Sequence, residues 1–157
     1  RYFNVAGASK SGKIGEIEKS HGHLIKNIAI QSQKTKPQIN VYGNDYDTKD
    51  GTCVRDYIHV VDIANIHLKV LDKISEKKSS VILNCGYSKG TSVKDVIKSF
   101  KKNTKKKVLI KILQKRKGDM AKIIANSSKL KSFINWRPKF NNLNSIVQSA
   151  IKWEKRQ

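Results

Sequence analysis

The glycines and lysine of residues 7–13, GASKSGK, are spaced as in a phosphate-binding P-loop. A P-loop also needs a Ser or Thr after the lysine to hold magnesium, and a helix must open there so that backbone N–H groups converge on phosphate. Ile14 occupies the hydroxyl position, and the octet of residues 15–22 is polar with glycine at both ends. The stretch therefore predicts an ordinary loop after a short strand, not a site for ATP or GTP.

A second feature with chemical meaning is positive charge. The 157 residues include 33 Lys and Arg against 12 Asp and Glu, a formal net charge of +21. That balance is common in proteins that bind nucleic acid or anionic membrane surfaces. Only 5 of the 33 cations are Arg, and the densest basic run, residues 101–107, contains no aromatic residue that could stack on bases. We interpret the run as a solvated helix end and turn, with a phosphate-binding patch as the alternative, and expect no nucleic-acid partner.

The two cysteines, Cys53 and Cys85, are far apart and form no C-x-x-C pair. Neither a zinc site nor a disulfide framework is indicated, which favours a cytoplasmic compartment and no bound metal. No apolar run approaches membrane-spanning length, so we expect no membrane partner. The length is that of a single domain, although it leaves room for a larger whole, because the chain begins with Arg1 and not with Met.

The elements that would position these residues alternate along the chain. Apolar alternation and short apolar runs predict strands, and apolar residues at helical spacing predict helices. The expected strands are residues 2–5, 38–42, 53–59, 81–86 and 108–113. The expected helices are residues 23–30, 62–74, 93–102, 128–133 and 143–153. This alternation is typical of an α/β protein.

Several polar residues in these elements have structural roles available to them. Asp62 can cap the helix that follows it, and Ser92 with Asp95 forms a capping-box pattern. His59 lies in an extended run, where we favour a structural histidine over a general base. An independent α/β enzyme would also have a glycine-rich turn after a strand, enough strands for a central sheet, and a catalytic pair, and the sequence has none of these.

Several sequence blocks, taken in order, resemble one family. The longest is DGTCVRDYIHVVD, residues 50–62, and it is highly specific. The other blocks are short: residues 1–8 (RYFNVAGA), 23–25, 41–46 (VYGNDY), 84–86, 90–93, 115–119 and 135–138 (NWRP). Together they resemble the carboxy-terminal half of the UDP-glucose 4-epimerases, within the extended short-chain dehydrogenase/reductase family. The resemblance covers essentially the whole chain.

This resemblance implies a Rossmann-like fold that holds NAD, and a smaller lobe that grips the UDP part of UDP-glucose or UDP-galactose. In the family the sugar C4 hydroxyl is oxidised by hydride transfer to NAD, and hydride then returns to the other face of the 4-keto sugar. Residues 1–157 would be the carboxy-terminal portion, with parts of the Rossmann sheet near residues 1–8 and 53–86. The amino-terminal NAD-binding portion would be absent, and the complete protein would be a homodimer.

By position, the resemblance assigns Arg55 and Arg116 to the pyrophosphate, since guanidinium groups match phosphate oxygens and stay charged. The structural alternative for Arg55 is an ion pair with Asp50 or Asp56. Asn4, at a strand end, would offer a donor and an acceptor to a phosphate or uridine oxygen, or would simply form a turn.

The remaining assignments concern the cofactor, the base and the ribose. Tyr2 and Phe3 would lie at the nicotinamide and sugar, or in the strand core. His23 and Leu24 would begin a helix whose dipole favours an anion. Asp119 would accept from the ribose hydroxyls, or lie in a surface turn. The uracil would be flanked by Asn40, Val41 and Tyr42, with backbone atoms supplying contacts.

The departures from the family pattern limit the chemistry. The family's glycine-rich loop, its catalytic Ser or Thr and its Tyr-x-x-x-Lys pair lie before the position of Arg1, and no Tyr-x-x-x-Lys occurs in this sequence. We therefore interpret the chain as an isomerase fragment that supplies UDP-sugar binding and is inactive alone. Two alternatives are a related sugar-nucleotide dehydratase or decarboxylase, which the 50–62 block argues against, and a basic nucleic-acid-binding module.

Three substitutions mark local differences from relatives. Lys26 stands where many relatives carry Pro, and Lys117 stands where an acidic residue is common. Ile123 lies where a small residue in some relatives admits N-acetylated sugars, so a branched side chain there favours UDP-glucose and UDP-galactose.

Overall fold

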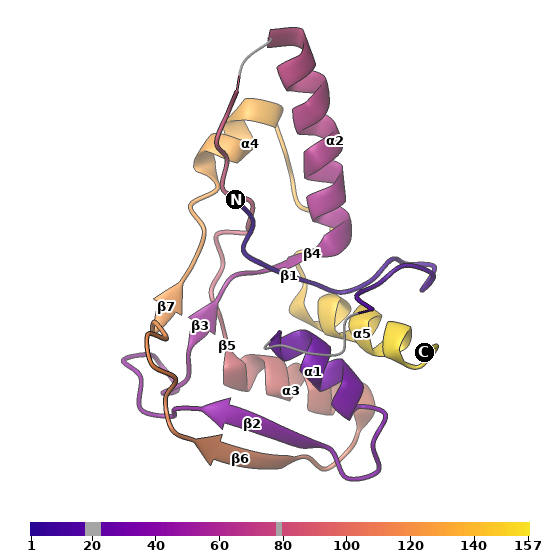
Figure 1. Ribbon diagram of the computed structural model, residues 1–157, viewed down its shortest axis with the longest axis vertical. Coiled ribbons are helices and arrows are strands. Elements are labelled where there is room, and N and C mark those ends of the chain that lie inside the picture. Colours follow the sequence, from indigo (N-terminus) through magenta and orange to yellow (C-terminus); the bar gives the residue numbers. More distant parts are fainter. Residues whose placement is uncertain (18–22, 78–79) are drawn as a thin grey trace.

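The computed structural model describes residues 1–17, 23–77 and 80–157. The last five residues of the polar octet expected as a loop, residues 18–22, therefore lie outside the described residues. The elements are arranged as a lower lobe and an upper arm (Figure 1). The helices in chain order are α1 Leu24–Gln31, α2 Val60–Lys77, α3 Val93–Thr104, α4 Ser128–Ile134 and α5 Leu143–Glu154. The strands are β1 Asn4–Ala6, β2 Gln38–Tyr42, β3 Val54–Arg55, β4 Tyr57–His59, β5 Thr91–Ser92, β6 Leu109–Leu113 and β7 Lys122–Ile123.

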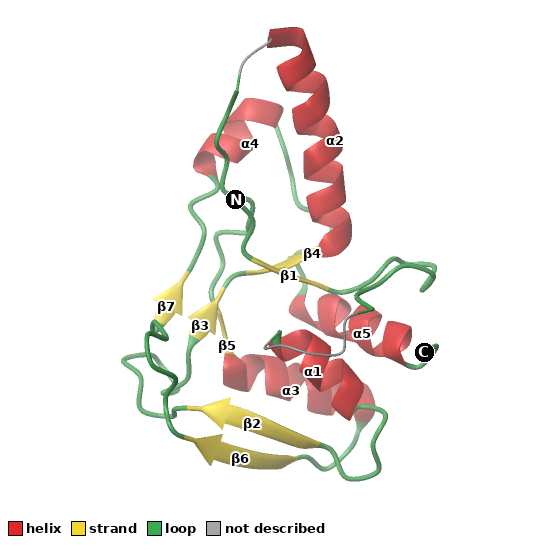
Figure 2. Ribbon diagram, viewed as in Figure 1, coloured by secondary structure: helices red, strands yellow, loops and turns green. Residues whose placement is uncertain are grey.

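We call α1, α3, α5, β2 and β6 the helical lobe. The three helices pack on one another, and the parallel pair β2–β6 lies beside them (Figure 2). The period-2 pattern of β2 places Ile39 and Val41 in the core and turns Gln38 and Asn40 outward. The lobe's core consists of Ala6, Ile25, Ile28, Ala29, Ile39, Val41, Tyr57, Val96, Ile97, Phe100, Ile146, Val147, Ala150 and Ile151.

We call β1, β4, α2, α4 and the extended segment 81–86 the upper arm. Strands β1 and β4 pair in parallel, with Asn4 opposite Tyr57. Helix α2 follows β4 directly and packs its apolar face toward α4. The arm's core consists of Ile58, Ile63, Ile66, Leu83, Cys85, Leu130 and Trp136.

A third small sheet lies between the lobe and the arm. Strand β3 is its centre, antiparallel to β5 and parallel to β7. The capping box predicted for α3 is present, because the Ser92 hydroxyl accepts from the Asp95 N–H and the Asp95 carboxylate accepts from the Ser92 N–H. The α/β class with parallel strands, predicted from the alternation, is confirmed. Within the described residues, no helix is both long and apolar enough to span a bilayer.

Three local predictions need correction. The strand expected over residues 53–59 is interrupted at Asp56, where the chain leaves the β3 sheet and joins β1. The strand expected over residues 81–86 is reduced to one bridge between Tyr2 and Cys85. Asp62 does not cap α2, because the helix begins at Val60, and Asp62 lies inside its first turn.

Candidate functional site

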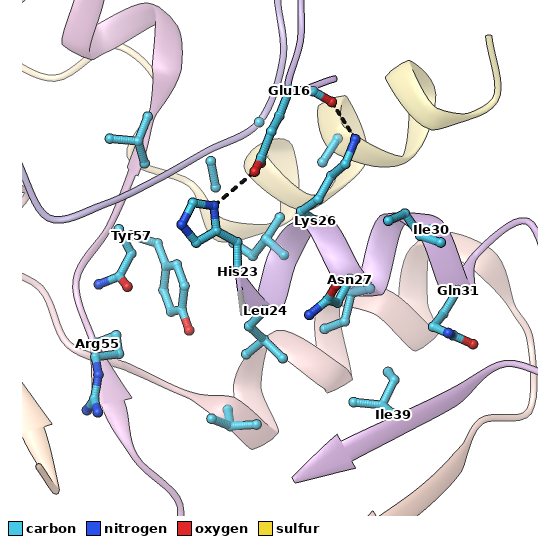
Figure 3. Close-up of a pocket in the computed structure, with 18 of the residues that line it drawn as sticks. Glu16, His23, Leu24, Lys26, Asn27, Ile30, Gln31, Ile39, Arg55 and Tyr57 are labelled. Carbon is cyan, nitrogen blue, oxygen red and sulfur yellow. Dashed lines mark hydrogen bonds and ion pairs between the residues drawn. The ribbon is translucent and has the colours of Figure 1, made fainter. Parts of the chain in front are cut away.

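A cavity of about 710 Å³ lies where the lobe meets the arm. It is walled by the β1 segment, the amino end of α1, β2, β3 and the 116–119 loop, and Figure 3 shows the part around α1. Its volume is within the usual range for small-molecule sites. The predicted residues that line it are Tyr2, Phe3, Asn4, His23, Leu24, Asn40, Tyr42, Arg55, Arg116 and Asp119. Val41 is the exception, because its side chain packs into the lobe core.

Arg55 and Asp119 form an ion pair at one end of this cavity, with 2.5 Å between Arg55 Nη2 and Asp119 Oδ1. Arg55 Nη1 also donates to the carbonyls of Val54 (2.9 Å) and Met120 (2.7 Å). These three contacts come from β3 and from the 116–120 segment, so the guanidinium is held in a fixed plane. The alternatives considered from sequence, pairs with Asp50 or Asp56, are not formed.

Both of those carboxylates are used elsewhere. Asp56 is fully buried and accepts from the backbone N–H groups of Tyr87 (3.0 Å) and Ser88 (2.8 Å), and more weakly from Ala125 (3.3 Å). Asp50 accepts from the Ser92 hydroxyl (2.5 Å) and from Thr52. Asp50 and Asp56 are therefore occupied by loop hydrogen bonds, and the carboxylate that pairs with Arg55 is that of Asp119.

Arg116 adds a second guanidinium to the same end of the cavity. Its guanidinium carbon lies 3.8 Å from the centroid of the Tyr42 ring, which is a cation–π contact. Stacking on a strand residue restricts the Arg116 side chain without neutralising its charge. With Arg55 paired to one carboxylate, the two guanidiniums leave a net positive charge here, which suits a ligand that carries phosphate.

The free edge of β2 contributes backbone groups. In the β2–β6 ladder the Leu109 N–H donates to the Pro37 carbonyl (3.0 Å), and the Gly43 N–H donates to the Leu113 carbonyl (2.9 Å). Alternate residues of a strand direct their backbone groups to the same neighbour, so the odd-numbered residues of β2 bond to β6. Asn40 consequently directs its N–H and C=O to the other edge, which is free to bind a planar polar ring.

The amino end of α1 forms another wall. His23 is the residue before the helix, its side chain makes no cap hydrogen bond to the helix, and the first turn carries no acidic residue. The first N–H groups of a helix lack helical partners and carry a partial positive charge. Together with the guanidiniums of Arg55 and Arg116, this arrangement makes the cavity favourable for an anion.

Asn4 and the aromatic residues before it lie at the β1 side. The Asn4 amide donates to the Asp56 carbonyl (3.2 Å), which fixes the orientation of its side chain. Tyr2 is 67% exposed and Phe3 is half-buried, so both rings reach the cavity edge without being part of the core. The prediction that either is ordinary strand core is not supported by this exposure.

Several cavity residues were not predicted. Tyr57 follows Arg55 by two positions, and burial raises the pKa of its hydroxyl well above the usual value. The period-2 pattern of the 53–59 run was a signal that could have identified it. Glu16, Lys26 and Glu154 also line the cavity, but they come from three distant segments and carry no shared sequence signal.

His59 and Asp62 both have structural roles, as we expected from the sequence. The particular role expected of Asp62, capping α2, was wrong. His59 is buried, its Nδ1 accepts from the Val61 N–H (3.1 Å), and its Nε2 lies 3.2 Å from the Ser149 hydroxyl. Burial lowers the pKa of His59, which the charge of Asp62 partly offsets. His59 is not among the cavity residues.

The P-loop-like stretch is a turn that does not cradle an anion. Two of its N–H groups bond within the turn, where Ser9 donates to the Ile14 carbonyl (2.8 Å) and Gly12 donates to the Ser9 carbonyl (2.8 Å), and the Ala8 N–H donates to the Ser149 hydroxyl (3.1 Å). The carbonyls of Ser11 and Gly12 accept from Arg156 instead. No helix opens at residue 13, so the interpretation as an ordinary loop is confirmed for its described part.

The structure is an α/β fold with a cavity of small-molecule size, and the end of this cavity that Arg55 and Arg116 line has an excess of positive charge. The chain belongs to the NAD dependent epimerase/dehydratase family, whose family model matches residues 1–86. It is 39% identical over 157 residues to a UDP-glucose 4-epimerase of Rhizobium meliloti, with 100% of this chain and 48% of that protein aligned. It is 37% identical to a UDP-glucose 4-epimerase of Azospirillum brasilense, with 99% of this chain and 44% of that protein aligned.

Solved structures of UDP-glucose 4-epimerases are also similar to this chain. A UDP-glucose 4-epimerase from Stenotrophomonas maltophila, with bound NAD and formylated UDP-arabinopyranose, superposes with a TM-score of 0.93 at 35% identity. The Bifidobacterium longum enzyme, in complex with NAD+ and UDP, superposes with a TM-score of 0.89 at 36% identity. Each alignment covers 99% of this chain and 46% of the other. The chain thus spans about half the length of the relatives that it matches.

Proposed function

We propose that this chain supplies the UDP-sugar-binding part of an NAD-dependent UDP-glucose 4-epimerase, an isomerase that interconverts UDP-galactose and UDP-glucose in galactose metabolism. The observation that carries the proposal is the meeting of Arg55, Arg116 and Asp119 with the free edge of β2 in one cavity. Arg116 and Asp119 lie about 60 to 80 residues after β2 and Arg55 in sequence, and each of these groups suits a different part of a uridine diphosphate.

The parts of the ligand can be assigned in turn. The guanidiniums of Arg55 and Arg116 and the amino end of α1 would bind the pyrophosphate. The Asn40 N–H and C=O would pair with the uracil edge as a neighbouring strand would, and Asp119 would accept from the ribose while held by Arg55. Val41 would take part only through its strand, because its side chain is in the core.

The named relatives share the UDP nucleotide but differ in the sugar. A relative from Arabidopsis thaliana that is 37% identical is named UDP-arabinose 4-epimerase 1, and a Campylobacter jejuni structure at 40% identity is a UDP-Glc/GlcNAc 4-epimerase. Ile123, expected to disfavour N-acetylated sugars, lies in β7 opposite Arg55 and is 37% exposed. We keep the preference for UDP-glucose and UDP-galactose as a proposal, which turnover of UDP-N-acetylglucosamine would contradict.

NAD would supply the oxidising and reducing power at the sugar C4. Tyr2 and Phe3 reach the cavity edge and could contact the nicotinamide, but they form only one side of such a site. The described residues contain no glycine-rich turn after a strand that could hold the pyrophosphate of NAD. The rest of the cofactor, and the base that removes the C4 proton, would be held by residues outside this sequence. We further propose a cytoplasmic homodimer for the complete protein.

The alternatives are less well supported. A Pseudomonas aeruginosa protein named RMD, complexed with NADPH, superposes with a TM-score of 0.74, but at 17% identity it shows only the shared fold. A nucleic-acid-binding module would bind unrelated DNA or RNA with steep salt dependence and would not discriminate UDP from ADP.

Two measurements test the proposal. Calorimetric titration of the 157-residue chain should show binding of UDP in preference to ADP, and Arg116→Ala should weaken UDP binding about tenfold or more. The chain joined to the remaining half of the Rhizobium meliloti enzyme should convert UDP-galactose to UDP-glucose without added NAD-reducing or NAD-oxidising partner. Binding of ADP as tight as UDP would overturn the nucleotide assignment.

A further inference from the structure

Glu16 is tied into the cavity wall from two helices. Its backbone carbonyl accepts hydrogen bonds from Trp153 Nε1 of α5 (2.9 Å) and from the Lys26 ammonium of α1. Its carboxylate meets His23, with 2.9 Å between Glu16 Oε1 and His23 Nδ1. Figure 3 shows Glu16 above His23 and beside Lys26. The residue therefore connects His23 and Lys26, at the amino end of α1, with Trp153 of α5.

The anchor of Glu16 does not depend on its own side chain. The Lys26 ammonium is buried and also pairs with the Glu154 carboxylate; these two side chains are 5% and 10% exposed. A buried ammonium requires such partners, so Lys26 will keep its contact with the Glu16 carbonyl. Removing the Glu16 carboxylate should consequently leave the Glu16 backbone in place.

The carboxylate acts on His23. The His23 side chain is 68% exposed and makes no cap hydrogen bond to α1, so the contact with Glu16 is what fixes its ring. The other ring nitrogen, Nε2, points away from Glu16 to the side on which Tyr57 and Arg55 lie (Figure 3). Exposed ion pairs add little to stability. The contact must therefore matter mainly for the orientation of the imidazole.

We propose that Glu16 is a positioning residue, whose carboxylate holds the His23 ring so that Nε2 faces a phosphate of a nucleoside diphosphate bound at the amino end of α1. In a neutral imidazole one ring nitrogen donates and the other accepts, and only the doubly protonated ring donates from both nitrogens. With Glu16 accepting at Nδ1, a protonated His23 donates from Nε2 and adds to the helix N–H groups that attract the anion. The inference rests on the proposed function for the class of ligand.

The test compares UDP with uridine, which lacks the phosphates. Titrations use the 157-residue chain, Glu16→Ala, Glu16→Gln, His23→Ala and the control Asp72→Ala, which removes an exposed carboxylate from α2 outside the cavity. Glu16→Ala should weaken UDP binding about fivefold and uridine binding less than twofold. Glu16→Gln keeps an oxygen that accepts from Nδ1–H, so it should restore most of the affinity. Asp72→Ala should change neither ligand.

Coupling between the two residues completes the test. In the His23→Ala background, Glu16→Ala should have no further effect on UDP binding, because its action passes through the imidazole. Equal losses for UDP and uridine, or wild-type UDP affinity in Glu16→Ala, would overturn this inference and leave the proposed function standing. A wild-type chain that melts cooperatively but binds neither ligand would overturn the proposed function itself, and this inference with it.

Discussion

The helical lobe and the upper arm cover their apolar residues to different degrees. The lobe cluster holds fourteen buried residues, twelve from α1, β2, α3 and α5 and two, Ala6 and Tyr57, from strands β1 and β4 of the arm. The arm buries seven, and α2 leaves Leu68 and Leu71 at 62% and 57% exposure on the face that does not meet α4. An exposed apolar pair on a helix is typical of a surface that another element covers. The lobe also leaves apolar side chains in solvent, since Leu109 and Ile112 of β6 are 64% and 46% exposed. The two regions therefore differ in the size of the buried core, and each has one uncovered apolar face: β6 in the lobe and α2 in the arm.

This difference bears on where the cavity lies. Most of its walls come from the lobe, whose core holds α1 and β2 in place, and the arm contributes β1 and the adjoining residues. Nucleotide-binding geometry should therefore depend more on the lobe core than on the arm core. Matched substitutions in the two regions can test this.

The largest expected effect is in the lobe core. Phe100 of α3 is fully buried among α1 and α5, and Phe100→Ala should lower the free energy of unfolding by about 3–5 kcal/mol, because it removes a large side chain and leaves a cavity. Phe133→Ala in α4 is the matched change in the arm, where the ring is only partly buried, and should cost clearly less. Urea unfolding monitored by circular dichroism measures both. Equal losses would mean that the arm is as well packed as the lobe.

An intermediate effect is expected at Asp62, which joins the two regions. Its buried carboxylate accepts from the Tyr87 hydroxyl (2.7 Å) and from the N–H groups of Phe140 (2.9 Å) and Lys139 (3.2 Å) on the segment that leads to α5. Asp62→Asn replaces an acceptor by a donor and should cost about 2–3 kcal/mol. Asp72 is exposed and lies ten residues later in the same helix, so Asp72→Asn should change the free energy of unfolding by no more than about 0.5 kcal/mol. An Asp62→Asn variant as stable as Asp72→Asn would show that the joint does not depend on this carboxylate.

Local features of the helical lobe could be predicted from the sequence. The capping box of Ser92 and Asp95 and the alternation of β2 depend on residues a few positions apart, and the structure has both. The interruption at Asp56 could not be predicted, because it depends on N–H groups of residues 87, 88 and 125 that converge on its carboxylate. The exposure of Leu68 and Leu71 could not be predicted either, because an apolar helical pattern does not show how many faces of the helix other elements cover.

The candidate site shows the same division. Arg55, Arg116 and Asp119 could be selected only by resemblance to a family, because periodicity carries no information on segments that meet across more than 60 residues. The structural alternative for Arg55, an ion pair with Asp50 or Asp56, was wrong. Both carboxylates are close to Arg55 in sequence, but they accept hydrogen bonds from loop residues, and Arg55 pairs with Asp119. The pair of Lys26 and Glu154, which are 128 residues apart, has no sequence signal at all.

The smallest effect on stability is expected on the exposed face of α2. In Leu68→Gln/Leu71→Gln, both side chains are already more than half exposed in the folded state, so the free energy of unfolding of this chain should change by less than about 1 kcal/mol. The same change removes apolar surface that can associate, so sedimentation velocity should show less self-association than for the unsubstituted chain. Ile66→Gln is the matched change on the buried face of the same helix, and it should unfold the arm. A loss of more than about 2 kcal/mol in the double variant would show that this face of α2 is already covered in solution, and that the arm has no uncovered apolar face there.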